Sequence, residues 1–483
     1  MVVVFVLVAV AVLALLAGVH RYVWRRLVGD TTAEGGLARR AGTVAVWVLP
    51  LLSVGAFAGG RAGFPFWLQR VLAWPGYLWL AVLLYLTLAL LVGEAVRPLL
   101  RRVLARRASR TAAAAPAAPG AEPAVPGAAP AATAGPAGAE AEPAAVPRTA
   151  TLAAAASATK TLPGTPAAAP VEAATDTDAP AASPAPEPAP EPEAEPAPDS
   201  APAPHAPADP SRRLFVARAV GGAAALAGLG TVGYGTYGVL RGPRVKRITV
   251  PLARLPRSAH GFRIAVVSDI HLGPILGRAH TRRIVDTINA TSPDLVAVVG
   301  DLVDGTVADL GTAAEPLAGL EARHGSYFVT GNHEYFSGAA EWVDHVRELG
   351  LRPLENARVE IAGFDLAGVN DVAGESEGQG PDFAAALGDR DRSRASVLLA
   401  HQPVVIDDAV AHGVDLQLSG HTHGGQLWPG NLLAELANPT VAGLERYGDT
   451  QLYVSRGAGA WGPPVRVGAP SDITVVELAS KRT

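Results

Sequence analysis

Five short apolar runs in the second half of the chain are each followed by aspartate, asparagine or histidine side chains. The segments read Ser-Asp-Ile-His at 268–271, Gly-Asp-Leu-Val-Asp at 300–304, Gly-Asn-His-Glu at 331–334, Ala-His at 400–401 and Gly-His-Thr-His at 420–423. A buried strand delivers the residues that follow it to the carboxyl edge of a sheet, where α/β proteins place their sites. Carboxylate, amide and imidazole ligands without thiolate suit Mn, Fe, Zn or Co. The sequence, which has no cysteine, therefore predicts a site for divalent metal ions.

The spacing of these residues fits a site with two ions. Asp269 and His271 are two positions apart, so beyond the end of a strand both can face the same way. His421 and His423 have the same spacing, which lets one loop offer a nitrogen to each ion. Asp301 follows a glycine, and a tight turn there leaves both of its carboxylate oxygens free.

These segments resemble the motifs of the calcineurin-like metallophosphoesterases, which are D-x-H, G-D-x-x-D, G-N-H-[DE], a single histidine and G-H-x-H in this order. All five motifs are present without a substitution. The Gly-His-Thr-His-Gly-Gly-Gln form and the later glycine-rich loop at 457–466 look like the membrane-associated bacterial branch of that family. The resemblance covers about Arg244 to Leu478 and says nothing about the first half of the chain.

The resemblance implies a ligand set and a reaction. The expected ligands are Asp269, His271 and His423 for one ion, Asn332, His401 and His421 for the other, and Asp301 as the bridge. His333 is expected to be the general acid that protonates the leaving oxygen, or to stabilise the transition state. Asp304 and Glu334 are expected to orient ligands. Two such ions would support hydrolysis of a phosphate mono- or diester by attack of a metal-bound hydroxide.

Two other functions stay open at this point. Some members of the family are pyrophosphatases, and such an activity on a nucleotide-linked lipid or sugar is the first alternative. The second is a membrane sensor that binds metal or phosphate without turnover. A sensor is expected to have lost at least one ligand, whereas this chain keeps all of them together with His333. A metal-dependent phosphoesterase is therefore the preferred interpretation.

Residues 243–483 are predicted to form one α/β domain, because strand-like runs alternate with helical patterns such as 278–290 and 338–349. The family resemblance implies a sandwich of two facing mixed sheets flanked by helices. Trp461 and Arg466, in the glycine-rich loop, are candidates to meet substrate, Arg466 through a phosphate oxygen. The other histidines of this domain are expected at the surface or as hydrogen-bonded core residues; they are His260, His280, His324, His345 and His412.

Residues 1–110 are predicted to form an all-α transmembrane region of three helices. Apolar runs at 2–19, 43–59 and 77–93 are long enough to span a hydrocarbon core of roughly 30 Å, and a cleaved signal peptide is the alternative for the first. Residues 111–210 are almost wholly Ala, Pro, Gly, Glu and Thr and are predicted to be a disordered linker. The segment 211–242 begins Ser-Arg-Arg-Leu-Phe and is expected to be a twin-arginine-like signal or a fourth transmembrane helix.

Arginine counts in the loops predict which side of the membrane each segment occupies. The segments after the first and third apolar runs hold five and six arginines, and the loop after the second holds two. A multi-pass protein of the cell membrane with an extracytoplasmic catalytic domain is therefore expected, although the basic residues at 241–247 favour the opposite side. The net charge of −4 gives no case for nucleic acid. The expected partners are the membrane and an envelope or lipid-linked phosphate-ester substrate.

Overall fold

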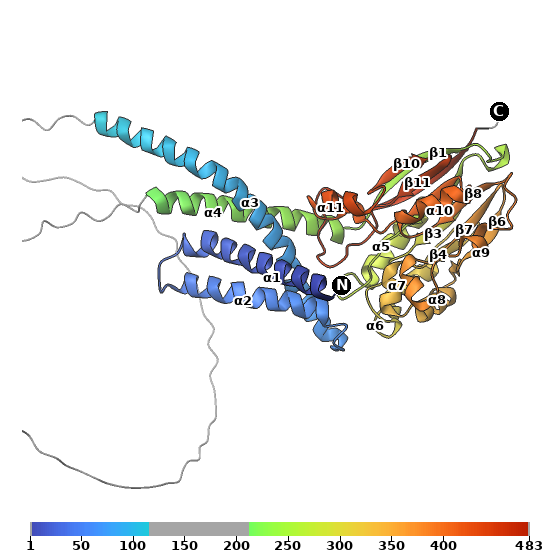
Figure 1. Ribbon diagram of the computed structural model, residues 1–483, viewed down its shortest axis with the longest axis horizontal. Helices are drawn as coiled ribbons and strands as arrows, with labels where there is room; N and C mark the ends of the chain where they lie inside the picture. Colours follow the sequence, from blue (N-terminus) through green and yellow to red (C-terminus); the bar gives the residue numbers. More distant parts are fainter. Residues whose placement is uncertain (1, 115–211, 482–483) are drawn as a thin grey trace, which may run out of the picture. The chain divides into compact units, whose positions relative to one another are not determined.

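The α/β domain is built on two mixed sheets, as the family resemblance implies (Figure 1). The computed structural model describes residues 2–114 and 212–481. The strand order of the first sheet is β1 (Arg244–Leu252), β12 (Asp472–Ser480), β2 (Phe262–Val267), β3 (Leu295–Val299), β4 (Ser326–Val329) and β5 (Arg352–Pro353). The order of the second is β10 (Gly443–Tyr447), β11 (Thr450–Val454), β9 (Leu416–Ser419), β8 (Ala395–Leu399), β7 (Phe364–Gly368) and β6 (Ala357–Ile361).

The strands that lead into the predicted site run parallel. β2, β3 and β4 are parallel neighbours, with Ile264 opposite Leu295 and Val296 opposite Ser326. β8 and β9 are parallel neighbours in the second sheet. Parallel strands end at the same edge of a sheet, so each sheet gathers its own post-strand residues at one edge.

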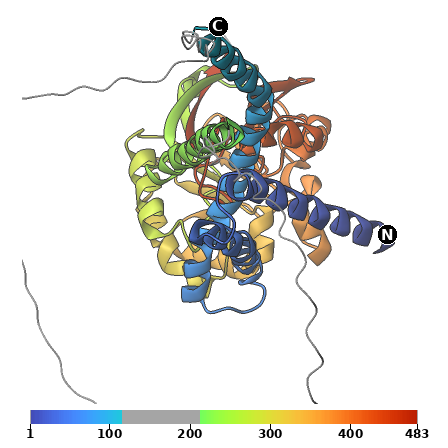
Figure 2. The same cartoon turned by 90° about the vertical axis from the view of Figure 1, so that its left-hand side faces the viewer.

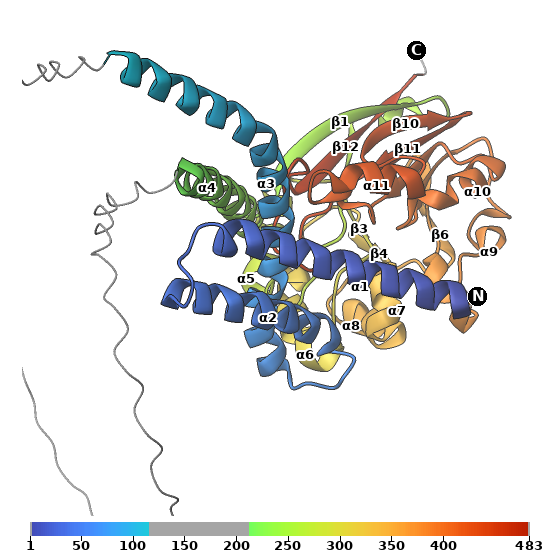
Figure 3. The same ribbon diagram turned by 60° about the vertical axis from the view of Figure 1, so that its left-hand side comes forward.

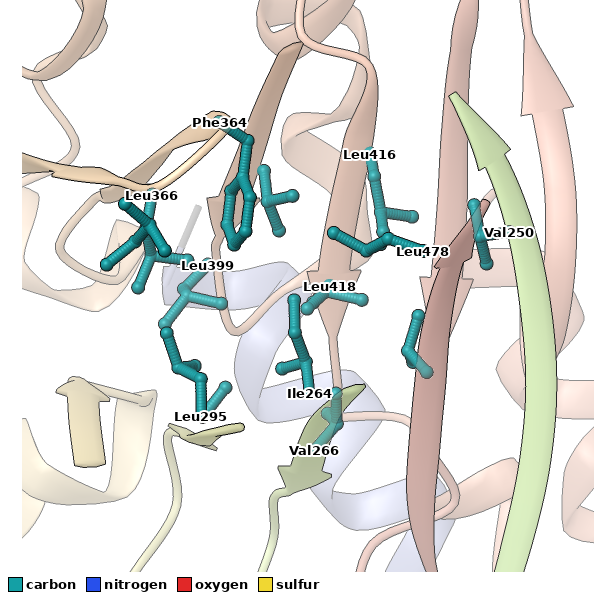
Figure 4. Packing of buried hydrophobic residues seen from close by; sticks show 14 of the residues in the cluster. Val250, Ile264, Val266, Leu295, Phe364, Leu366, Leu399, Leu416, Leu418 and Leu478 are labelled. Atoms are coloured by element: carbon teal, nitrogen blue, oxygen red, sulfur yellow. The ribbon is translucent and has the colours of Figure 1, made fainter. Parts of the chain in front are cut away.

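The side chains between the two sheets form the main core. Figure 4 shows Ile264 and Leu295 of the first sheet approaching Leu399 and Leu418 of the second, with Phe364 in the same layer. The strands alternate their side chains between this layer and a second apolar layer on the outer face. Both faces are covered, which explains why a central strand such as β3 reads as an uninterrupted apolar run.

Helices and short turns cover the outer faces of both sheets. In Figure 3, α6 and α8 lie side by side over the first sheet. The helices of the domain are α5 (Arg278–Asn289), α6 (Val307–Ala314), α7 (Asn332–Ser337), α8 (Ala339–Glu348), α9 (Phe383–Leu387), α10 (Ile406–Ala411) and α11 (Gly430–Ala437). Short 3-10 turns lie at Arg257–Ala259, Glu315–Gly319, Val372–Glu377, Pro403–Val405 and His423–Gly425.

Four long helices, drawn in blue, cyan and green in Figures 1 and 2, form the rest of the described chain. They are α1 (Val2–Trp24), continued by a π-helical turn (Arg25–Gly29), α2 (Leu37–Ala58), α3 (Phe66–Ala114) and α4 (Arg212–Leu240). All four are long and apolar enough to cross a membrane. α4 runs unbroken over the segment for which an export signal or a fourth membrane helix was expected.

The structure extends α3 well beyond the apolar run at 77–93. The helix continues on both sides because leucine, alanine and arginine are good helix formers, and Pro75 and Pro98 lie inside it. The predicted linker at 111–210 lies outside the described residues, apart from its first four positions, which end α3. Within the described residues, the four long helices and the α/β domain belong to one compact unit.

Candidate dinuclear metal site

The predicted ligands follow five strands, and the two sheets bring them together. Asp269 and His271 follow β2, Asp301 follows β3, and Asn332 opens helix α7 just after β4. His401 follows β8, and His421 and His423 follow β9. The site therefore takes side chains from the carboxyl edges of both sheets.

One cluster consists of Asp269, His271 and His423. Nε2 of His423 lies 3.4 Å from Oδ1 of Asp269 and 3.0 Å from Nε2 of His271. One ligand atom from each residue lies within 4.8 Å of the others, close enough to hold a common metal ion. These are the three residues predicted for the first ion.

A second cluster consists of Asp301, His401 and His421, whose ligand atoms also lie within 4.8 Å of one another. Nε2 of His401 lies 3.1 Å from Oδ2 of Asp301, and Nδ1 of His421 lies 2.9 Å from Oδ1 of Asn332. The same Oδ2 of Asp301 is 3.7 Å from Nε2 of His271 in the first cluster. Asp301 thus lies between the two clusters, at the position that a bridging carboxylate requires.

The contacts of the His401 ring show whether these residues fit a metal ion. Nδ1 of His401 lies 2.9 Å from the carbonyl oxygen of Val299, which can only accept, so Nδ1 carries the proton of the neutral ring. Nε2 faces the Asp301 carboxylate, and within the described residues it has no hydrogen-bond partner. Burial lowers the pKa of His401, but the Asp301 carboxylate outweighs it and raises that pKa well above its ordinary value, so this buried position favours positive charge. A divalent cation supplies that charge and takes carboxylate and imidazole ligands.

Backbone strain concentrates on the predicted ligands. In the described chain, left-handed φ values between 47° and 70° occur at Asp269, His271, Asp301, His421 and His423. Residues with a Cβ atom rarely adopt this conformation, which costs on the order of 1 to 3 kcal/mol at each site. The turns after β2, β3 and β9 aim side chains back toward one point, and surrounding packing holds them there.

Glycines next to the ligands allow the close approach of these turns. A Cβ atom on Gly331 would overlap with the carboxylate of Asp301, and one on Gly420 would overlap with that of Asp269. Gly300 has φ of +71°, and a Cβ there would lie 2.6 Å from Nδ1 of His401. The glycines of three motifs are thus required by space, and Gly300 is required by its conformation as well.

The predicted general acid, His333, lies beside the first cluster. Its Nδ1 is 2.8 Å from Oδ1 of Asp304, and its side chain is 15% exposed. Nδ1 of His271 lies 2.8 Å from the same oxygen. Burial raises the pKa of Asp304, but the two imidazoles outweigh it and lower that pKa to about 2. Asp304 therefore orients both rings as a carboxylate.

Glu334 holds two ligand turns together by accepting backbone hydrogen bonds. Its carboxylate accepts from the amides of Asp301 at 3.0 Å, Leu302 at 2.8 Å and Gly331 at 2.6 Å. Burial, and then the nearby Asp301, raise the pKa of Glu334 to about 7. The side chain joins the turn after β3 to the start of α7.

Two other expectations need correction. The guanidinium of Arg466 is buried and donates to the carbonyls of Gly459 at 2.7 Å, His423 at 3.0 Å and Ala469 at 3.1 Å. It supports the loop that carries His423, so it is not free to reach a phosphate.

His280 was expected at the surface or as a hydrogen-bonded core residue. It is buried, yet neither ring nitrogen has a hydrogen-bond partner in the described chain.

Residues of the helical region also line the cavity at the site, and sequence reasoning did not find them. Phe57, Arg61 and Tyr77 share this cavity with His271 and His333. Phe57 and Tyr77 belong to apolar helices and Arg61 to the loop between them, so no local pattern distinguishes them from ordinary membrane-flanking residues.

Comparison with known proteins agrees with the motifs. Residues 262–425 match the sequence profile of the calcineurin-like phosphoesterases. A zebrafish (Danio rerio) transmembrane protein with metallophosphoesterase domain is 39% identical over 259 residues, which is 51% of this chain and 59% of that protein. This chain therefore spans little more than half the length of that relative.

Two bacterial relatives are covered more fully. An uncharacterized metallophosphoesterase of Helicobacter pylori is 38% identical over 259 residues, 53% of this chain and 69% of the relative. Another from Aquifex aeolicus is 34% identical over 243 residues, 49% of this chain and 92% of the relative. With the five motifs intact and their side chains gathered at one site, the chain belongs to the metallophosphoesterase family.

Proposed function

We propose that this protein is a membrane-anchored phosphoesterase with two divalent metal ions, which hydrolyses phosphate mono- or diesters. The observation that carries the proposal is the meeting of the two ligand clusters at Asp301. The proposed ligands are Asp269, His271 and His423 for one ion, Asn332, His401 and His421 for the other, and Asp301 for both. Bound ions would supply the positive charge that holds the ester and lowers the pKa of the attacking water.

The chain's own residues supply the proton and the orientation. His333 is proposed to give a proton to the leaving oxygen. Its Nδ1 is held by Asp304 at 2.8 Å, which leaves Nε2 to face the substrate. The ring of Trp461 packs edge-on against the ring of His333, with 5.8 Å between the two ring centroids. In hydrolysis, water oxygen bonds to phosphorus, the bond from phosphorus to the leaving oxygen breaks, and that oxygen takes the proton.

We further propose a multi-pass protein with its catalytic domain outside the cytoplasm. Arg26, in the π-helical turn that continues α1, pairs with Glu94 of α3 at 2.9 Å. Arg218 of α4 donates to the carbonyl of Thr31 at 3.0 Å. The arginine-rich ends of these helices therefore lie together, as cytoplasmic ends should. Contacts with the catalytic domain occur at the other end of α2, where Phe57 meets Trp461.

This orientation also accounts for the basic residues at 241–247. Arg244, Lys246 and Arg247 belong to strand β1 of the catalytic domain, so they are part of a folded sheet that follows α4. Protease added to intact cells should digest the catalytic domain. Digestion only after lysis would place the domain in the cytoplasm and overturn the proposed topology.

Hydrolysis of bis(p-nitrophenyl) phosphate by the full-length protein with Mn²⁺ tests the proposed activity. The wild type should be active, and Asp301→Ala should lose at least ~100-fold because both clusters lose their shared carboxylate. Asp309→Ala is the matched control, since Asp309 lines the same cavity but is in neither ligand cluster. No hydrolysis by the wild type, despite measured Mn²⁺ binding, would favour the sensor.

A further inference from the structure

The cavity at the active site is walled on one side by the apolar helices. It has a volume of about 270 Å³. His271, Asp304 and His333 line it from the catalytic domain, and Phe57 and Tyr77 line it from α2 and α3. A phosphoesterase that acts on small soluble esters has no need of such a wall.

Aromatic rings connect the helices to the proposed general acid. The ring of Phe57 lies 4.9 Å from that of Tyr77 and 6.1 Å from that of Trp461. The ring centroid of His333 lies 5.8 Å from that of Trp461. It lies 5.5 Å from that of Phe336, which is also on α7. Phe57, Trp461 and Phe336 are 39%, 49% and 64% exposed, so they present apolar surface next to the reacting centre.

This apolar wall lies at the level where the helices would leave a bilayer. Phe57 is in the last turn of α2, one residue before its end at Ala58. Further along α3, the hydroxyl of Tyr85 donates to the carbonyl of Trp428 at 3.0 Å. The helix that follows Trp428, α11, exposes three leucines. The cavity and the segment before α11 thus both contact helices that are long and apolar enough to cross a membrane.

The same cavity holds a cationic side chain. Arg61, in the loop between α2 and α3, lines it and makes no ion pair with any described residue. The acidic residues nearby are engaged elsewhere: Asp304 with the imidazoles, and Asp309 with the hydroxyl of Thr306 at 3.2 Å. An arginine at this place matches the charge of an anionic head group.

We propose that the substrate is a phosphate ester carried on a membrane lipid, entering from the bilayer. Phe57, Trp461 and Phe336 contact the first part of its tail, and Arg61 contacts its anionic head. The phosphorus then lies over the ligand clusters, with the leaving oxygen toward His333. This inference rests on the proposed phosphoesterase function and names its substrate class.

Two diesters with one leaving group test the tail contact: hexadecyl p-nitrophenyl phosphate and ethyl p-nitrophenyl phosphate, given to the full-length protein in detergent micelles with Mn²⁺. The readout is the ratio of kcat/KM for the two esters, which cancels any general loss of activity. Phe57→Ala should lower this ratio about tenfold relative to wild type, as loss of a tail contact does. Trp67→Ala is the control, because Trp67 is exposed on α3 but does not line the cavity.

The outcomes separate the two proposals. No hydrolysis of either ester by the wild type refutes the phosphoesterase function itself. Hydrolysis of both, with the same ratio in wild type and Phe57→Ala, refutes the lipid substrate and leaves the function standing.

Arg61→Gln should raise KM for the hexadecyl ester several-fold with little change in kcat, and Arg70→Gln, outside the cavity, should not. An unchanged KM in Arg61→Gln would remove Arg61 from the site.

Discussion

Oδ1 of Asp304 lies 2.8 Å from Nδ1 of His333. The same atom lies 2.8 Å from Nδ1 of His271, so one carboxylate oxygen orients a proposed metal ligand and the proposed general acid. The ligand's position and the acid's position are therefore linked through a single atom. A substitution there should disturb both without touching the reacting phosphate.

Asp304→Asn should lower kcat by about 10- to 100-fold, the usual effect of losing a partner that orients a ligand. An amide cannot accept from two rings with the strength of a carboxylate. KM should change much less than kcat, and the melting temperature should stay near that of wild type. Asp309→Asn serves as the control. A wild-type kcat in Asp304→Asn would show that the rings of His271 and His333 hold their positions without the Asp304 carboxylate.

Glu334→Gln should destabilise the domain. The carboxylate accepts from three backbone amides, whereas the amide side chain would turn a donor toward at least one of them. One buried donor left without a partner costs roughly 1 to 3 kcal/mol. Thermal unfolding should therefore begin several degrees lower than in Glu348→Gln, whose side chain is 77% exposed. Equal melting temperatures in the two variants would contradict this role.

Gly331→Ala should abolish activity, whereas Gly277→Ala should not. A methyl group on Gly331 would overlap with the Asp301 carboxylate and push it out of the space between the clusters. Gly277 also precedes a helix, but it has φ of −119° and open space around its Cβ position. Binding of Mn²⁺, measured by calorimetry beside hydrolysis, should fall only in Gly331→Ala. Retained binding there would mean that the β3 turn can shift to make room.

The sequence predicts the members of the site better than their contacts. The run before Asp301 is wholly apolar and forms strand β3 (Leu295–Val299), because a strand buried on both faces has a clear signal. The 3.4 Å approach of His423 to Asp269 depends on how two sheets pack, which no local pattern encodes. The place of Phe57 beside the site depends in the same way on contacts between distant segments.

The environment of His280 could not be predicted from the sequence, because its burial depends on the fold and not on its own chemistry. A histidine in the first turn of an amphipathic helix gave no sign that both ring nitrogens would be enclosed without a partner. Burial, and then the positive charges of Arg283 and Arg466, lower its pKa to about 3.

The His280 ring should make the protein less stable in mild acid. The unfolded chain takes up a proton near pH 6.5 and the folded chain only near pH 3, so the unfolded state binds more protons between these values. Stability is therefore unaffected above pH 6.5 and falls below it, by up to roughly 1.4 kcal/mol per pH unit. His280→Leu should show a smaller drop in melting temperature from pH 7.5 to 5.5 than wild type. His412→Leu controls for removal of a histidine; equal drops in all three would exclude His280 as the cause.

Helix α11 should lie in the lipid surface. Leu432, Leu433 and Leu436 are 55%, 71% and 84% exposed, and on a helix positions three and four apart share a face. Asn431 and Glu435 pair with each other at 3.4 Å on another side of the helix. An apolar face of this kind beside membrane-crossing helices is typical of an interfacial helix.

The absence of cysteine from the chain allows a direct measurement of this placement. A fluorophore sensitive to polarity can be attached at Leu433→Cys or Glu435→Cys in the full-length protein, reconstituted in phosphatidylcholine and phosphatidylglycerol vesicles. The Leu433→Cys label should emit at shorter wavelength and be quenched by spin-labelled lipids, because its side chain has no protein surface to cover it. The Glu435→Cys label, on the polar side, should emit as in water. If both labels emit as in water, the leucines face solvent or a protein partner, and the catalytic domain is held at the membrane by the long helices alone.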